Sequence, residues 1–250
     1  MRVVLAGKVN LLHTNQTDVL ESINSLLKKL DFEVVELDNE IVCGEASINL
    51  GLLDNIEKVF SEFKKNIYNL KADVVVSAYA AGVSKWKNDI PELLNMELGV
   101  PYIHLTQLIA EEFDKNKPDL KPFPHSYFVQ HGCTLGRKMG QYNFIREILK
   151  LIPEIEVLEE QYPTAEIEGI DPAEFNSCPG SWLNFSQPEL GDYVKENYVL
   201  EIVKPANPEY AGSTCANGHL GIRQGLEIAE IDDIKPLYFT QLLDGITEVK

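Results

Sequence analysis

Three cysteines in similar settings are the residues of this chain best suited to chemistry. Cys133 follows the apolar run Tyr127-Phe128-Val129 and precedes a helix-like segment, and Cys178 and Cys215 come at wide intervals after it. Each lies close to a glycine, namely Gly132, Gly180 and Gly218. Thiolates are ligands for soft metals and iron–sulfur clusters, and glycine permits the tight turns that bring loops together. The pattern predicts one metal site assembled from three distant loops.

Other roles for the four cysteines are a redox thiol or a small buried residue. Residues 1–7 are typical of a first strand and lack the long apolar core of a secretory signal, so we expect a cytoplasmic protein without structural disulfides. No C-x-x-C pair is present, which excludes a thioredoxin-type motif and a zinc ribbon. For Cys43 we favour simple burial.

Charge and length restrict the possible partners. The formal net charge of −17 argues against nucleic acid, because phosphate binding depends on Lys and Arg, and it disfavours attachment to anionic lipid by charge. An apolar fraction of 44% over 250 residues is enough for a substantial core. We find no apolar run of the roughly 18–20 residues that a transmembrane span requires.

Strands alternate with helices along the chain. Apolar β-branched runs at 2–6, 33–37, 73–77 and 101–105 are separated by helical spacing at 17–30 and 56–70. This alternation predicts an α/β fold with parallel sheets and right-handed crossovers. The loops at the carboxyl ends of such strands gather at one edge, where ligands bind, so the three cysteine loops are expected to converge there.

The same order of features occurs twice, which indicates an internal duplication. Gly7 to Gln16 and Gly132 to Gln141 are both nine residues apart, and Leu105-Thr106-Gln107-Leu108-Ile109 matches Phe239-Thr240-Gln241-Leu242-Leu243. The lysine- and proline-rich segment 114–124 is a candidate linker. We predict two pseudo-symmetric Rossmann-like halves, residues 1–113 and 125–250.

With this duplication the chain resembles the CCG-domain (cysteine-rich) family, which includes the cysteine-rich subunits of heterodisulfide reductases and of some succinate dehydrogenases and fumarate reductases. Each half in that family carries Gly-Cys after its first strand, Cys-Cys-Gly after the second and C-x-x-C after a later one. Cys133, Cys178 and Cys215 match these motifs in the second half, with Gly218 in place of the last cysteine. In the first half the positions are Gly7-Lys8, Val42-Cys43-Gly44, and Tyr79 with Gly82.

The resemblance implies one [4Fe-4S] cluster, in the second half alone, held through three irons by Cys133, Cys178 and Cys215. The fourth iron would be open or bound by His131 or His219, each of which lies near a ligand cysteine. Against this, each histidine and each glycine also has an ordinary structural explanation, as a hydrogen-bonding loop residue or a turn.

The resemblance further implies an iron–sulfur electron-transfer subunit of a multi-subunit oxidoreductase. It would pass electrons between flavin- or iron–sulfur-containing subunits and a disulfide, thiol or quinone, in the cytoplasm or peripherally on the inner face of the membrane. Two alternatives stay open: a cluster-free structural subunit of such a complex, and a stand-alone lyase or hydrolase with an open-iron cluster.

Overall fold

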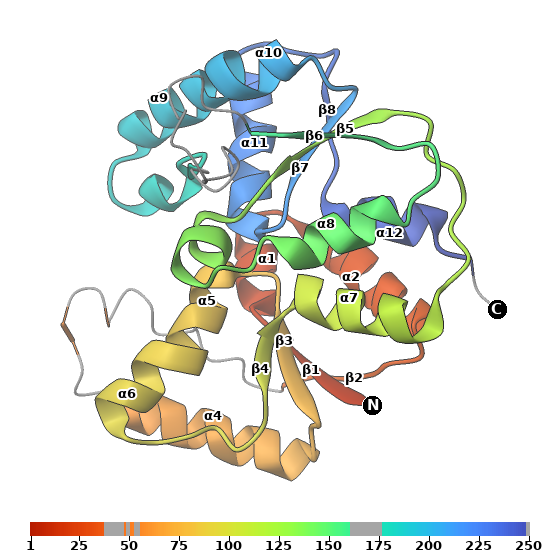
Figure 1. Ribbon diagram of the computed structural model, residues 1–250. Helices are drawn as coiled ribbons and strands as arrows, with labels where there is room; N and C mark the ends of the chain where they lie inside the picture. The colour runs from red at the N-terminus through yellow and green to blue at the C-terminus, as the bar shows by residue number, and fades with distance from the viewer. Residues whose placement is uncertain (38–47, 49–50, 53–55, 161–176, 249–250) are drawn as a thin grey trace, which may run out of the picture.

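The structure is a computed structural model that describes residues 1–37, 48, 51–52, 56–160 and 177–248. It contains two four-stranded parallel sheets with the strand orders β2-β1-β3-β4 and β6-β5-β7-β8, which are the same order repeated (Figure 1). The predicted α/β fold with two pseudo-symmetric halves is therefore confirmed.

The first sheet uses residues from the amino-terminal part of the chain. Its strands and the helices between them are β1 (Arg2–Ala6), α1 (Lys8–His13), α2 (Thr17–Lys29), β2 (Glu33–Val35), α4 (Ile56–Leu70), β3 (Val74–Ser77), α5 (Ala80–Ser84), the π-helical turn η1 (Lys85–Asp89), α6 (Ile90–Leu94), β4 (Tyr102–His104) and α7 (Leu105–Asn116). The sequence did not predict α5, η1 and α6, because their short turns carry no sustained helical spacing.

The second sheet repeats this plan with different crossovers. Its elements are β5 (Ser126–Gln130), the π-helical turn η2 (Thr134–Lys138), α8 (Asn143–Lys150), β6 (Glu156–Glu159), the 3₁₀ turn η4 (Ser181–Phe185), α9 (Pro188–Tyr198), the π-helical turn η5 (Val199–Val203), α10 (Lys204–Ala206), β7 (Tyr210–Ser213), α11 (Ala216–Ile228), β8 (Lys235–Pro236) and α12 (Phe239–Ile246). The segment around Cys43 lies outside the described residues.

Helix α2 shows how the sequence pattern produces the packing. Its apolar residues Val19, Leu20, Ile23, Leu26 and Leu27 recur at helical spacing, and all five are buried. Asp18 lies in the first turn and two lysines in the last, where each charge is favourable beside the helix dipole. The strands alternate in the same way: Val3 and Leu5 face one core cluster while Val4 and Ala6 face another.

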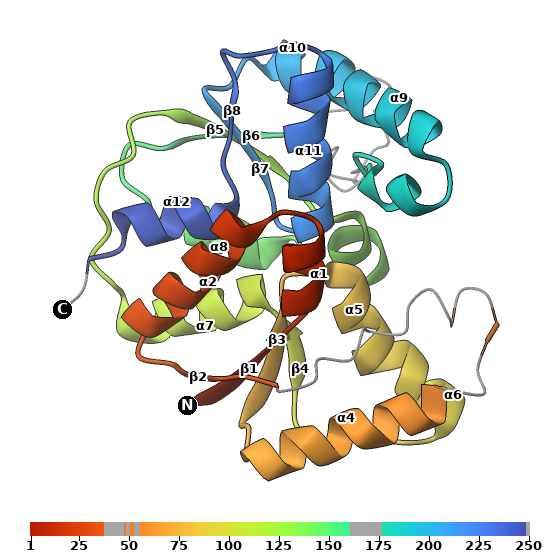
Figure 2. The ribbon, with the colours of Figure 1, turned by 180° about the vertical axis from the view of Figure 1, so that it is seen from behind.

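A single core cluster joins the two halves. It contains inward-facing residues of both sheets together with helices α2, α7, α8 and α12. Helix α12 packs on α2, and α7 packs on α8, so each half contributes a helix that lies against the other half (Figures 1 and 2). Within 114–124, Leu120 forms an antiparallel bridge with Thr247. The outer sheet faces are covered by α4, α5 and α6 in one half and by α9 and α11 in the other.

No helix within the described residues is both long and apolar enough to cross a membrane.

Candidate functional site

Two of the three cysteines follow strands of the second sheet closely. Cys133 is the residue before η2, three positions after β5 ends, and Cys215 is the N-cap of α11, two positions after β7. Cys178 lies between β6 and η4. All three thiols are free and half-buried. The π-helical turn directly after Cys133 is of a kind that is frequent at functional sites.

The structure brings these three thiols together. The side chains of Cys133 and Cys178 interact with each other, and Cys215 interacts electrostatically with both. Residues 45 and 37 positions apart in the chain thus meet at the carboxyl edge of one sheet. The arrangement does not match a single-ion site: within the described residues, no three His, Cys, Asp or Glu side chains form a group that would hold one metal ion.

Charge is distributed unequally among the thiols. The interaction with Cys178 lowers the pKa of Cys133 to about 6, against the effect of burial, with help from the Thr134 hydroxyl and the Arg137 guanidinium. The same interaction, together with burial, raises the pKa of Cys178. Burial also raises the pKa of Cys215. The interaction therefore favours the thiolate form at Cys133 and the thiol form at Cys178.

Backbone N–H groups face the sulfur of Cys215 from both halves of the molecule. Those of Asn217 and Gly218 belong to the first turn of α11, and that of Ala80 opens α5 in the first half. The contact is reciprocal, because the Ala216 N–H donates to the Ala78 carbonyl at 3.0 Å. N–H groups at helix starts stabilise negative charge, which suits a thiolate or the sulfurs of a cluster.

Gly132 permits the close approach of the Cys133 and Cys215 loops. A Cβ atom at this position would lie 2.9 Å from Cys215 Cβ, closer than such atoms pack. The Gly132 N–H donates to Thr214 Oγ1 at 2.8 Å, which ties the same two loops together. Gly180 has a positive φ of 85° and begins η4, so it turns the chain directly after Cys178.

Gly218, which replaces the second cysteine of a C-x-x-C, has no room for a side chain. A Cβ atom there would overlap Ser213 Oγ and would lie 2.5 Å from Gln130 Oε1. The missing fourth thiol is therefore excluded by packing as well as by sequence. A hydrogen bond between Ser213 and Gln130 takes up the space.

The two histidines have different surroundings. His131 is buried, its Nε2 lies 3.3 Å from Glu159 Oε1, and its ring packs edge-on against Tyr142. His219 is buried in the first turn of α11 beside the ring of Tyr238, and its Nδ1 has no hydrogen-bond partner within the described part of the chain. Burial lowers the pKa of His219 to about 3, so this ring is neutral.

Two buried polar residues that the sequence reasoning missed connect the cysteine loops. Gln130, the last residue of β5, contacts Ser177 beside Cys178 and Ser213 near Cys215. Glu160 accepts hydrogen bonds from both the N–H and the hydroxyl of Ser177, at 3.0 and 2.9 Å. The available signal was a polar residue ending an otherwise apolar strand, as Gln130 does after Tyr127-Phe128-Val129.

Comparisons with known proteins identify one family model that matches part of this chain. The family model for the cysteine-rich domain (CCG) matches residues 10–81. The predicted resemblance to the CCG family is confirmed. The matched region lies in the first half, which has lost most of the motif cysteines, so the similarity there rests on residues other than the ligand positions.

Two characterised relatives are subunits of multi-subunit reductases. The chain is 25% identical over 229 residues to a subunit of the fumarate reductase (CoM/CoB) of Methanothermobacter marburgensis, covering 91% of this chain and 43% of that protein. It is 28% identical over 210 residues to a subunit of the dihydromethanophenazine:CoB–CoM heterodisulfide reductase of Methanosarcina barkeri, covering 80% and 48%. The chain thus spans about half the length of the curated relatives it matches.

Among solved structures, a putative Asp/Glu racemase from Yersinia pestis aligns over 97% of this chain and 94% of its own, with 12% identity and a TM-score of 0.41.

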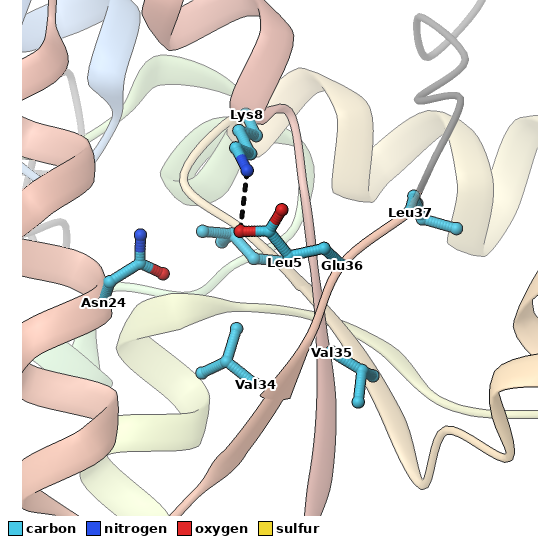
Figure 3. A pocket seen from close by; sticks show the side chains of 7 residues that line it. All are labelled: Leu5, Lys8, Asn24, Val34, Val35, Glu36 and Leu37. Carbon is cyan, nitrogen blue, oxygen red and sulfur yellow. Dashed lines mark ion pairs between the residues drawn. The ribbon is translucent and has the colours of Figure 1, made fainter.

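In the first half, Lys8 and Tyr79 stand at two motif positions that cysteines occupy in the second half. Tyr79 corresponds to Cys215: its N–H donates to Ser77 Oγ at 3.1 Å, as that of Cys215 donates to Ser213 Oγ at 3.0 Å. The buried Tyr79 ring packs against Gly7. Lys8, which corresponds to Cys133, forms a 2.7 Å ion pair with Glu36 at the edge of a small pocket (Figure 3). Cys43 lies outside the described residues.

Proposed function

We propose that this chain binds one [4Fe-4S] cluster through Cys133, Cys178 and Cys215 and serves as an electron-transfer subunit of a multi-subunit redox complex. The observation that carries the proposal is the meeting of three free thiols from three loops at one sheet edge. The relationship to subunits of fumarate and heterodisulfide reductases supports the same class of function.

The residues present fit a cluster better than a single ion. In a cluster each thiolate binds a different iron, so the three sulfurs need not be as close as the ligands of one metal. The N–H groups that face Cys215 and the guanidinium of Arg137 beside Cys133 would offset the negative charge of a thiolate-bound cluster. When bound, the cluster would supply one-electron transfer.

The chain's own residues would hold and shield this group. The N–H of Gly180 faces the sulfur of Cys178, and Ala80 brings the first half into contact with Cys215. Of the two candidate fourth ligands we favour His219, because the Nε2 of His131 already lies against Glu159. A neutral imidazole in place of a fourth thiolate would raise the cluster potential.

A subunit that holds a single cluster would act as an electron relay. With a single cluster the subunit would relay electrons between a flavin- or iron–sulfur-containing partner and a disulfide, thiol or quinone. The acidic surface implied by a net charge of −17 favours partners that present a basic face.

Anaerobic purification with iron and sulfide analysis tests the proposal. We expect a brown protein with about four irons per chain. Separate Cys133→Ser, Cys178→Ser and Cys215→Ser variants should lose the iron, whereas the control Cys43→Ser should retain it. A colourless, iron-free wild-type protein after reconstitution with iron and sulfide would refute the cluster and favour a structural subunit.

A further inference from the structure

Gln130 contacts all three cysteine loops through one side-chain amide. It is 1% exposed and ends β5, where it pairs in register with Ser213 of β7. Its Nε2 donates to the carbonyl of Ser177 at 2.8 Å and also to the carbonyl of His131. Its Oε1 accepts a hydrogen bond from Ser213 Oγ at 2.5 Å. Donor and acceptor of the amide are both engaged.

Each of these partners is adjacent to a thiol. Ser177 directly precedes Cys178, and His131 is two residues before Cys133. Ser213 Oγ, while donating to Gln130, accepts the N–H of Cys215 at 3.0 Å. The backbone of Gln130 completes the connection, because its carbonyl accepts the N–H of Thr214 at 3.0 Å. One buried residue therefore fixes the three loops relative to one another.

We infer that Gln130 is a positioning residue that sets the relative placement of Cys133, Cys178 and Cys215. The requirement for glutamine follows from the contacts: a side chain of this length must donate to the Ser177 carbonyl and accept from the Ser213 hydroxyl at once. Methionine has a similar length and volume but supplies neither strong hydrogen bond. The consequence of Gln130 for iron binding rests on the proposed function, but the effect of Gln130 on the placement of the thiols does not.

Thiol labelling of the reduced, metal-free protein tests the effect of Gln130 on the thiols separately from its effect on iron binding. Alkylation rates of individual cysteines would be measured by mass spectrometry for wild type, Gln130→Met and Gln16→Met. Gln16 is a matched control, because it is fully buried, it is in the first half, and its amide donates to Thr14. In Gln130→Met we expect the labelling rates of Cys178 and Cys215 to rise about fivefold or more, since fivefold corresponds to the roughly 1 kcal/mol net contribution of one hydrogen bond.

A third variant tests that the effect is transmitted loop by loop. Ser213→Ala removes the acceptor of the Cys215 N–H but leaves the bond from Gln130 to the Ser177 carbonyl. It should raise labelling of Cys215 while Cys178 stays within about twofold of wild type. General loosening of the fold would instead expose all three thiols equally in every variant, including Gln16→Met, and that result would overturn the inference. Unchanged labelling of Cys178 in Gln130→Met would overturn it as well.

Iron reconstitution then adds the functional readout. If wild type takes up iron, Gln130→Met should bind it more weakly and show an altered electron paramagnetic resonance signal, with Gln16→Met resembling wild type. Wild-type iron and signal in Gln130→Met would overturn the role at the cluster. If wild type takes up none, the proposed function fails while the labelling result still decides the role of Gln130.

Discussion

Gly132→Ala tests the steric basis of the site. The new Cβ atom would lie 2.9 Å from Cys215 Cβ and 3.3 Å from Thr214 Oγ1. Carbon atoms pack best at about 3.5–4.0 Å, so the two loops would have to separate by roughly 0.6 Å. Cys215 Cβ is fixed to the backbone and cannot rotate away. Overpacking of this kind costs about 1–3 kcal/mol, and each kcal/mol lowers the melting temperature of a protein of this size by about 2–4 °C.

The assay is chemical denaturation of the reduced, metal-free protein, with Gly245→Ala as the control. Gly245 is exposed in α12, and a Cβ atom there would have no described neighbour within 4 Å. Alanine at this position should therefore stabilise the helix by about 0.5–1 kcal/mol. The two substitutions are thus expected to have opposite signs. A neutral or stabilising Gly132→Ala would contradict the close packing of these loops.

A double-mutant cycle isolates the responsible contact. Cys215→Ala keeps the Cβ atom that Gly132→Ala would strike, whereas Cys215→Gly removes it. The cost of Gly132→Ala should therefore be smaller in the Cys215→Gly background than in the Cys215→Ala background, by about 0.5 kcal/mol or more. Equal costs in both backgrounds would refute the argument.

Three further predictions concern charge. Burial raises the pKa of Glu159, but hydrogen bonds from His131 and Arg146 outweigh it and lower the pKa to about 2. Wild type should therefore lose stability relative to Glu159→Gln as the pH falls from about 4.5 towards 2. The difference in stability between wild type and the exposed control Glu156→Gln should stay constant over the same range. Burial lowers the pKa of His104 to about 4, and its neutral ring caps the Thr106 N–H. Because the unfolded state takes up a proton at a higher pH than the folded state, the stability of wild type should decline as the pH falls from about 6.5 to 4. His104→Asn should lack this decline in melting experiments, and an equal decline would contradict the prediction. Arg137→Gln should raise the pKa of Cys133 above about 6 and slow its alkylation near that pH, unlike Lys138→Gln, whose lysine pairs with Asp89.

The sequence predicted the fold well because the signals for it are local. Strands such as Val74–Ser77 and helices such as α2 carry their periodicity in consecutive residues, and the repeated order of elements indicated two similar sheets. The sequence also indicated which cysteines would converge, because parallel strands bring their carboxyl ends to one edge. The packing of α7 on α8 and of α12 on α2, each across the two halves, was not predictable from the sequence. Helical spacing identifies the apolar face of a helix but not the element that this face contacts.

The polar frame of the site was also outside the reach of sequence patterns. Gln130 and Glu160 are recognisable only once β5, β7 and the Cys178 loop are seen together, because their partners are distant in the chain. Likewise, the sequence placed both histidines near cysteines but could not distinguish them. The approach of Glu159 to the His131 ring distinguishes the two histidines.

The first half contributes contacts to the cysteine site of the second half, although it carries other residues at most of the motif positions. Its Tyr79 loop receives the Ala216 N–H through Ala78 and presents the Ala80 N–H to the sulfur of Cys215. Tyr238 of the second half supports the Cys215 loop, since its hydroxyl donates to the Thr214 carbonyl at 3.3 Å. The duplication thus supplies the Cys215 loop with a pseudo-symmetric loop to pack against. The N-terminus of α11, which follows Cys215, is thus held on one side by the N-terminus of α5.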